Sequence, residues 1–370
     1  MIPEGLAGSQ FSFNFTVRLH PSGGNIMKAL IKFDRGREGM GIWDIPEPTP
    51  KKGELKVRVL VAGICGGDIH SMNDERDCVM PVALGHEYVG QVVEIGEDVE
   101  KFNIGDWVVT LPACYSCGEC EFCRRGLVTL CPERKSIGTH VNGAMAEYLV
   151  VPEKYSFKVP PEIRDIEEIK KYALIEPMAC VARGVYERID VHPGDIAVVT
   201  GPGTIGLFAV QVLKSRGANV LVYGLPNDKK RLDLALELGA KMVFTDSEEL
   251  KSALYKENPR GADITCDASG AVAAQDMCFQ LVRTHGTHLQ LGHFGDKKIP
   301  CHIDLIFDKE VNYVASNSTG MKTWDIALWL VNAGMVDLKP LMSLQLPLTE
   351  WEKGFDAMLN QEGYKILLLP

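Results

Sequence analysis

The stretch Val198-Val199-Thr200-Gly201-Pro202-Gly203-Thr204-Ile205-Gly206 decides the fold of this chain. A short apolar run leads into a Gly-x-Gly-x-x-Gly spacing, and the apolar residues 207–213 follow before Gly217. This order predicts a strand, a tight turn and a helix, the context in which the spacing indicates a dinucleotide site. The first glycine makes the turn, the second lets the backbone approach a pyrophosphate, and the third lets the helix pack on the sheet. We therefore predict that residues 201–206 bind the cofactor, with a purely structural turn as the alternative.

Beyond about residue 176, strand and helix patterns alternate. Strands are expected at 219–223, 242–244, 263–266 and 288–291, and helices at 229–238 and 248–256. This rhythm predicts an α/β fold with a parallel, doubly wound sheet and the glycine turn at its first crossover. A helix over 324–333 and a strand over 365–369 complete the chain.

The first part of the chain has a different pattern of apolar residues. Short Val/Ile/Leu runs, as at 55–59, 89–95 and 107–109, are separated by Gly, Pro and Asp and predict a barrel-like, mostly-β unit. The first strand is expected to start at Met27. Residues 1–26 show no sustained period, so we expect a disordered extension, with an edge strand over Phe11 to Phe15 as the alternative.

Composition narrows the class of protein. A length of 370 residues suggests two domains, and an apolar content of 46% is enough to form their cores. A net charge of -10 argues against nucleic acid or an anionic membrane as the main partner. No apolar run is long enough to span a bilayer, and no secretory signal is visible. Eleven cysteines then indicate a reducing cytoplasm, where clustered thiols hold metal more often than they form disulfides.

Four cysteines form the most specific motif, with the spacing Cys117-x2-Cys120-x2-Cys123-x7-Cys131. Four thiolates in a short lobe can close a tetrahedral shell around zinc and leave no open position, as in structural sites. The residues between them are polar, which disfavours reading these cysteines as buried apolar residues. We predict a structural zinc, with an iron–sulfur cluster as the alternative.

A second set of candidate ligands is dispersed along the chain. It consists of one thiol, one imidazole and two carboxylates, each beside glycine or proline: Cys65, His86, Glu87 and Glu176. Such a mixed set suits a catalytic zinc with a position open to water or substrate. From spacing alone this hypothesis is weak, because a single histidine or glutamate more often has a structural role.

Together, these motifs resemble those of the zinc-containing medium-chain dehydrogenases, in the branch of sorbitol (polyol) and threonine dehydrogenases. The likeness rests on Cys-Gly-x-Asp-x-His at 65–70, Gly-His-Glu at 85–87, the four-cysteine lobe, Glu-Pro at 176–177 and the glycine turn, in that order. It implies a GroES-like catalytic domain from 27–175 and 315–370, with a Rossmann domain from 176–314 inserted. It also implies two zinc ions per chain, NAD or NADP, and a homodimer or homotetramer.

The resemblance also implies roles for residues near the catalytic zinc. His70, with a free pKa near 6.5, is expected to relay the proton of the alcohol, or else to bond ribose or backbone. The family usually has Ser or Thr where this chain has Gly67, so a water or a substrate hydroxyl replaces that group, or activity is impaired. His293 and its neighbours His285 and His288 are interpreted as structural or cofactor-lining.

The second cofactor signal departs from the usual pattern. An acidic residue about 20 positions after the glycine turn usually bonds the ribose of NAD, but the strand over 220–223 ends at Gly224. Asp228 could still reach back, while Lys229, Lys230 and Arg231 follow closely. We predict that Gly224 and Arg231 line the cofactor site, and the missing acid favours NADP slightly. A solvated helix start is the alternative for the basic run.

The leading hypothesis is a cytoplasmic oxidoreductase that transfers a hydride between a secondary alcohol (polyol, sugar or sugar-derived) and a nicotinamide cofactor. The first alternative is a threonine-type dehydrogenase, whose hydroxy amino acid needs a cationic partner that the sequence does not identify. The second alternative is a non-catalytic zinc- and nucleotide-binding protein, which only Gly67 supports.

Overall fold

The computed structural model describes residues 24–295 and 298–370, whose strands form a six-, a seven- and a three-stranded sheet. The predicted extension over 1–26 lies almost entirely outside these residues. The first strand begins at Ile26, one residue before the expected start. No helix in the described ranges is long and apolar enough to cross a membrane.

The six-stranded sheet is parallel throughout, in the order β11-β10-β9-β12-β13-β14. Its order changes direction at β9, the strand that leads into the glycine turn, as in doubly wound dinucleotide-binding folds. The strands are β9 (Ile196–Thr200), β10 (Asn219–Tyr223), β11 (Met242–Phe244), β12 (Ala262–Asp267), β13 (Val282–Gln290) and β14 (Asn312–Ala315).

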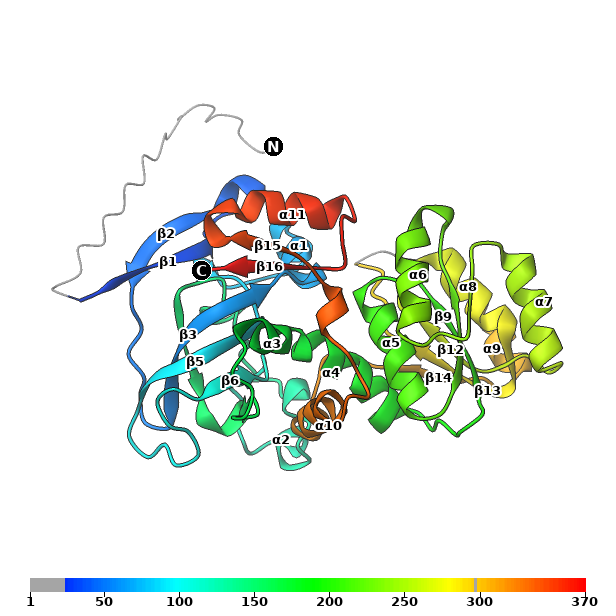
Figure 1. Cartoon of the computed structure of the whole chain (residues 1–370), viewed down its shortest axis with the longest axis horizontal. Helices are drawn as coiled ribbons and strands as arrows, with labels where there is room; N and C mark the ends of the chain where they lie inside the picture. Colours follow the sequence, from blue (N-terminus) through cyan, green and yellow to red (C-terminus); the bar gives the residue numbers. More distant parts are fainter. Residues whose placement is uncertain (1–23, 296–297) are drawn as a thin grey trace, which may run out of the picture.

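Helices cover both faces of this sheet (Figure 1). They are α5 (Thr204–Ser215), α6 (Lys229–Glu237), α7 (Ser247–Glu257), α8 (Val272–Leu281) and α9 (Ile303–Asp308). Strand β9 is buried on both sides because its alternate residues enter different cores. Ala197 and Val199 share a core with residues of α5 and α6, whereas Ile196 and Val198 pack with residues of α7. The predicted doubly wound α/β fold is confirmed.

The seven-stranded sheet takes strands from both ends of the chain, in the order β15-β16-β3-β5-β6-β8, with β7 also paired to β3. A smaller sheet, β2-β1-β4, completes the mostly-β body. The strands are β1 (Ile26–Lys32), β2 (Met40–Pro46), β3 (Glu54–Gly63), β4 (Val82–Ala83), β5 (Glu87–Ile95), β6 (Trp107–Thr110), β7 (Tyr148–Pro152), β8 (Ser156–Lys158), β15 (Met342–Pro347) and β16 (Lys365–Leu369).

The last strand brings the end of the chain to the middle of this body. Leu367 and Leu368 of β16 pair with Gly63 and Ala62 at the end of β3, and α11 (Trp351–Leu359) packs on β16. Figure 1 shows α11 and β16, in red, beside the blue and cyan strands of the first part of the chain. As a result, Lys365 lies next to the loop that carries Cys65.

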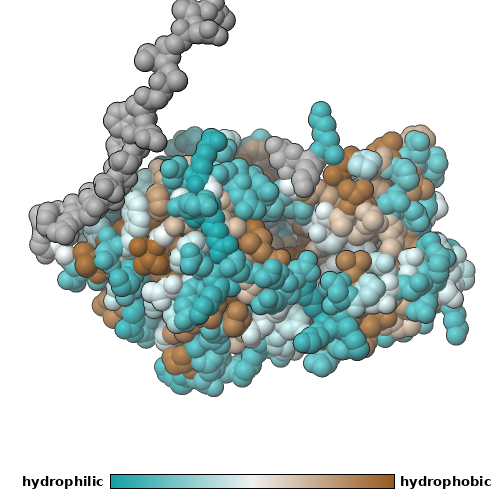
Figure 2. Space-filling view, turned by 90° about the horizontal axis from the view of Figure 1, so that it is seen from above, coloured by the Kyte–Doolittle hydropathy of each residue, from teal (hydrophilic) through white to brown (hydrophobic). Residues whose placement is uncertain are grey.

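Two helices lie between the mostly-β body and the six-stranded sheet: α4 (Ile175–Arg183) and α10 (Met321–Asn332) pack on each other, and α4 also packs on α5. The remaining helices of the mostly-β body are α1 (Gly66–Met72), α2 (Glu121–Arg124) and α3 (Ile166–Lys170). Figure 2 shows mainly polar side chains on the upper face, which is recessed between the two bodies. The domain boundaries at 175 and 315 stay a prediction; β14 ends at Ala315, one residue past the expected limit.

Candidate active site

Cys65 lies in the loop between β3 and α1 and caps the N-terminus of that helix. Its Sγ accepts a hydrogen bond from the Gly67 N–H at 3.4 Å, and its own N–H donates to Asp68 Oδ2 at 2.9 Å. The two bonds satisfy N–H groups that the helix start and its loop would otherwise leave unpaired. They also hold the sulfur in one orientation.

His86 and Glu87 stand at the start of β5, the neighbour of β3 in the sheet. One ligand atom each of Cys65, His86 and Glu87 lies within 4.8 Å of the others, and both His86 and Glu87 are buried. The structure therefore brings together three of the four residues predicted for the catalytic zinc. We call them the Cys65 group.

Lys365 of β16 closes one side of this group. Its Nζ donates to Glu87 Oε1 at 2.8 Å and to the Ile64 carbonyl at 3.0 Å, and it lies 2.6 Å from Glu87 Oε2. Lys365 thus pairs with both oxygens of the buried Glu87 carboxylate. Oε2 forms this ion pair without a well-aligned hydrogen bond, and a carboxylate oxygen keeps a further lone pair that a metal ion can take.

The charges around His86 also call for a cation. Burial opposes a charge on the imidazole, but the Cys65 thiol and the Asp68 carboxylate outweigh burial and raise the pKa of His86 to about 10. Asp68 Oδ1 lies 3.8 Å from His86 Nδ1. In such a low-dielectric site, a divalent ion neutralises the thiolate and carboxylates better than one proton does. The donor set of sulfur, nitrogen and oxygen suits zinc.

Glu176 approaches the Cys65 group from α4 but lies outside the closest set of ligand atoms. Burial raises the pKa of its carboxyl to about 7; the charge of His86 lowers it and that of Glu87 raises it. Cys180, one turn further along α4, donates its thiol to Glu176 Oε1 at 3.8 Å. Glu176 thus stays a predicted ligand, and its carboxyl has the Cys180 thiol as a neighbour.

The second metal constellation is compact. Cys117, Cys120, Cys123 and Cys131 bring their sulfur atoms within 4.8 Å of one another, and Cys117 Sγ lies 3.9 Å from Cys123 Sγ and 3.6 Å from Cys131 Sγ. Thiolates at about 2.3 Å from a common tetrahedral centre would stand roughly 3.8 Å apart. The N–H groups of Cys120 and Cys123 point at the preceding sulfurs. This geometry fits the structural zinc that the spacing predicts.

The glycine turn leaves room for a phosphate at one glycine only. A Cβ on Gly206 would overlap the carbonyl oxygen of Gly201, so this glycine is needed for packing. Gly201 has a φ of 87°, which favours glycine. By contrast, a Cβ on Gly203 would have no atom within 4 Å. This open space at the start of α5 fits the approach of a pyrophosphate to the helix N-terminus.

Asp267, at the end of β12, fixes the geometry around the turn and was not predicted from the sequence. It accepts hydrogen bonds from the Thr200 hydroxyl, from the N–H and hydroxyl of Ser269, and from the Gln290 amide. These bonds join the carboxyl ends of β9, β12 and β13. The sequence does not mark this buried carboxylate, because Thr200 and Gln290, its partners from β9 and β13, lie 67 and 23 residues away along the chain.

The other residues predicted to bind the cofactor are Gly224, Arg231 and Thr204, and each has a different environment. A Cβ on Gly224 would lie 2.8 Å from Pro202 Cγ, so the backbone leaves no room here for the usual acid. Arg231 donates to the carbonyls of Gln361 and Gly363, both at 3.0 Å, which ties α6 to the loop before β16. Thr204 likewise donates its hydroxyl to the Tyr364 carbonyl at 2.6 Å. The side chains of Arg231 and Thr204 thus hold the two bodies together.

His70 lies on α1, one turn beyond Cys65, and faces the other body. Its Nδ1 lies 2.6 Å from Glu75 Oε2, and its ring meets that of His293 with centroids 5.7 Å apart. His293 follows β13, and its carbonyl lies against Gly270, which donates its N–H to Asp267. A continuous set of contacts thus leads from Cys65 to the glycine turn. His288 instead is buried between Thr265 and Gln290.

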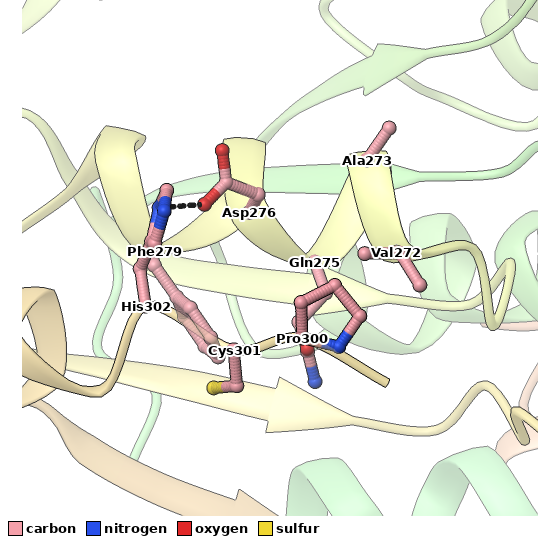
Figure 3. Close-up of a pocket in the computed structure, with 8 residues that line it drawn as sticks. All are labelled: Val272, Ala273, Gln275, Asp276, Phe279, Pro300, Cys301 and His302. Carbon is pink, nitrogen blue, oxygen red and sulfur yellow. Dashed lines mark ion pairs between the residues drawn. The ribbon is translucent and has the colours of Figure 1, made fainter. Parts of the chain in front are cut away.

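One cavity lies away from both the Cys65 group and the glycine turn. It has a volume of about 390 Å³, and Figure 3 shows that α8 and the segment before α9 form it, with Val272, Ala273, Gln275, Asp276, Phe279, Pro300, Cys301 and His302 as its lining. His302 Nδ1 lies 2.6 Å from Asp276 Oδ1. The cavity shares no residue with the Cys65 group or the glycine turn, and we give it no part in the reaction.

Comparison with known proteins agrees with this geometry. Residues 51–161 match the alcohol dehydrogenase GroES-like domain, and residues 204–333 match the zinc-binding dehydrogenase domain. A sorbitol dehydrogenase of Halalkalibacterium halodurans is 36% identical over 348 residues, which is 93% of this chain and 99% of the relative. A D-arabitol-phosphate dehydrogenase of Enterococcus avium is 34% identical over 345 residues, or 92% and 97% of the two chains.

Solved structures give the same result. A zinc-binding dehydrogenase of Sinorhizobium meliloti, bound to NADP, matches with a TM-score of 0.85 and 28% identity over 94% of this chain and 100% of that one. Fold, site and these matches define a zinc- and NAD(P)-dependent alcohol dehydrogenase. The chain belongs to the zinc-containing medium-chain dehydrogenases, in their polyol and threonine dehydrogenase-like branch.

Proposed function

We propose that this enzyme transfers a hydride between a polyol, sugar or sugar-derived secondary alcohol and NAD(P). The observation that supports this most is the set of contacts from α1 through His70 and His293 to the carboxyl ends of β9 and β12. Ligands of doubly wound sheets bind at this edge, where the strand order changes direction. Cys65 lies one helical turn before His70, so an alcohol at the Cys65 group and a cofactor at this edge of the sheet can meet.

In this proposal each residue has a defined task. Cys65, His86 and Glu87, with Glu176 behind them, hold the catalytic zinc, and Lys365 holds the Glu87 carboxylate in place through their ion pair. When bound, zinc acts as a Lewis acid that lowers the pKa of the alcohol, and the nicotinamide accepts the hydride. Residues 201–206 seat the pyrophosphate at the start of α5.

The proton needs a path to solvent, and His70 offers one. Its ring is partly exposed, and Nδ1 is bonded to Glu75 Oε2, so Nε2 is the atom that can take a proton from the alcohol side. Glu75, half-exposed, steadies the charged ring. Gly67 has no hydroxyl to take part, so we assign this step to His70 with an ordered water or a substrate hydroxyl before it.

The test is a substrate panel. The zinc-replete enzyme is assayed with polyols, aldoses and hydroxy amino acids by the absorbance of reduced nicotinamide, with NAD and with NADP. Turnover of a polyol or sugar, lost in Cys65→Ser and kept in Cys301→Ser, supports the proposal. If protein with two zinc ions per chain turns over none of the alcohols, the proposal is contradicted.

We further propose a cytoplasmic homodimer or homotetramer. Strand β14 is the edge of the six-stranded sheet, and near it Ile303 and Phe307 of α9 are 62% and 78% exposed. Exposed apolar side chains beside a sheet edge support an interface between subunits. Light scattering during size-exclusion chromatography tests this, and a monomer at micromolar concentration would contradict it.

A further inference from the structure

The space left by Gly67 is filled by an arginine. A Cβ built on Gly67 would lie 2.5 Å from Arg76 Nη1 and 3.7 Å from Cys65 Sγ. The Arg76 guanidinium therefore stands beside the Cys65 sulfur, where a serine or threonine side chain would otherwise lie. A larger residue at position 67 could not leave this cation in place.

The turn after α1 presents Arg76 to the site. The His70 carbonyl accepts hydrogen bonds from the N–H groups of Glu75 at 2.8 Å and Arg76 at 3.2 Å, which fixes the backbone there. Two nearby carboxylates already have partners: Glu75 pairs with His70, and Asp74 with Lys32 at 3.0 Å. Within residues 24–295 and 298–370, Arg76 forms neither an ion pair nor a side-chain hydrogen bond, and the residue is exposed. Its five N–H donors are therefore open to solvent and to a ligand that enters the site beside Gly67.

Both cations and carboxylates lie near Arg76. Asp74, Glu75 and Asp77 flank it in the sequence, and its charge also acts on the buried Asp68 carboxylate. On the other side, His140 has a lowered pKa, first because it is partly buried and then because of the charges of Arg134, Arg76 and Lys135. The turn is held against this segment by the Val79 N–H, which donates to the Thr139 carbonyl at 2.8 Å. An anion that approaches on the His140 side therefore meets three cations.

We propose that Arg76 binds an oxyanion group of the substrate, a phosphate ester or a carboxylate, next to the Cys65 group. This inference rests on the proposed function and narrows its substrate class to an anionic secondary alcohol. A planar guanidinium can hold either group through two parallel N–H···O bonds. Gly67 is then a specificity feature, since it makes room for the cation at the cost of the usual hydroxyl.

The experiment uses three compounds with the same carbon chain: sorbitol, sorbitol 6-phosphate and gluconate. In the wild type, kcat/KM is expected to be higher for one of the anionic compounds than for sorbitol. Arg76→Gln is expected to lower the ratio of anionic to neutral kcat/KM by about 10- to 100-fold, mostly through KM, as for loss of a charged hydrogen-bonded pair. Arg260→Gln is the matched control, because Arg260 precedes β12 at the opposite end of the strand from Asp267; it should leave the ratio unchanged.

A second variant tests the same idea without touching Arg76. Gly67→Ser places a side chain where Nη1 now lies, so it must displace the guanidinium and should lower the ratio by a similar factor. Turnover of sorbitol is measured in the same variant, so that a general change of activity is separated from a change of the ratio. Zinc content and circular dichroism of each variant verify that the protein is folded and loaded.

Binding is measured separately by calorimetry, with sorbitol 6-phosphate and gluconate each titrated into the zinc holoenzyme. Loss of sorbitol 6-phosphate binding in Arg76→Gln identifies a phosphate site, and a loss confined to gluconate identifies a carboxylate site. An unchanged ratio and unchanged binding in both variants would overturn the inference while leaving the proposed function intact. Absence of turnover on all alcohols, with binding that still depends on Arg76, would overturn the proposed function alone.

Discussion

Lys365 Nζ lies 2.8 Å from Glu87 Oε1, so the last strand of the described chain neutralises a carboxylate of the zinc site. Both side chains are at most 5% exposed. The pair links β16 to β5, strands that are not neighbours in the sheet, across the end of β3. It therefore joins the two chain segments that make up the mostly-β body.

The first prediction concerns this pair. Lys365→Met removes the cation and leaves Glu87 buried without its partner, which is expected to lower the free energy of unfolding by about 3–5 kcal/mol. Urea unfolding of the zinc-free protein measures it, because a zinc ion bound to Glu87 would replace the charge of the lysine. Lys353→Met is the control, because the Lys353–Glu350 pair lies on the surface and its loss should change little. Equal small effects in both variants would show that Lys365 does not compensate the charge of Glu87.

The second prediction separates the glycines of the turn. Gly203→Val fills the open space at the start of α5, so the cofactor Kd should rise about 10- to 100-fold with little loss of stability. Gly206→Ala should instead lower the free energy of unfolding by about 1–3 kcal/mol, because its Cβ overlaps the Gly201 carbonyl. Cofactor titration by fluorescence and thermal melting distinguish them. A stable Gly203→Val protein with unchanged affinity would remove the cofactor from this turn.

The third prediction concerns the two metal ions. Cys120→Ser should lower the zinc content from two ions per chain to one, and the lobe over 117–131 should become sensitive to protease. Cys301→Ser, a change at an exposed cysteine outside both groups, should keep both ions. Elemental analysis after gel filtration gives the count. Two zinc ions in Cys120→Ser would mean that the four thiols do not form one closed shell.

The fourth prediction concerns the cofactor. The backbone at Gly224 is too close to Pro202 for an acidic side chain, so the usual carboxylate is missing from this position. Asp228, whose Oδ2 accepts a hydrogen bond from the Leu225 N–H at 2.9 Å, lies 3.8 Å from Arg231 Nη1, which offsets its charge. We expect kcat/KM with NADP to equal or exceed that with NAD. The expected preference for NADP is slight, because the Arg231 side chain, which could otherwise bind the phosphate, donates to the carbonyls of Gln361 and Gly363. A strong preference for NAD would contradict it.

Sequence reasoning works well where the physical signal is local. The run Asn219–Tyr223 is strand β10 with the expected bounds, because a strand buried on both faces reads as a continuous apolar segment. The four cysteines of the lobe lie within 15 residues of one another, so their spacing alone indicates a shared ligand. Strand β13 begins at Val282, whereas the sequence predicted a start at His288. The first part of the strand gives no apolar signal, because Arg283, Thr284 and His285 are polar and only partly buried or exposed.

The signal fails where a site depends on tertiary neighbours. Lys365 opens an apolar strand, and nothing in its local sequence indicates that Glu87, 278 residues earlier, is its partner. Arg76 resembles any solvated loop arginine until the fold places it over Gly67. The sequence places Arg231 at the cofactor because it follows Gly224 closely. In the structure its side chain contacts the loop before β16, which the local sequence does not indicate.

The position of β16 also makes the zinc site depend on segments that lie far apart in the sequence. Cys65, His86 and Glu87 come from the first part of the chain, and Lys365 reaches Glu87 only when β16 pairs with β3. The pocket can therefore take its final geometry only once both segments have folded against each other.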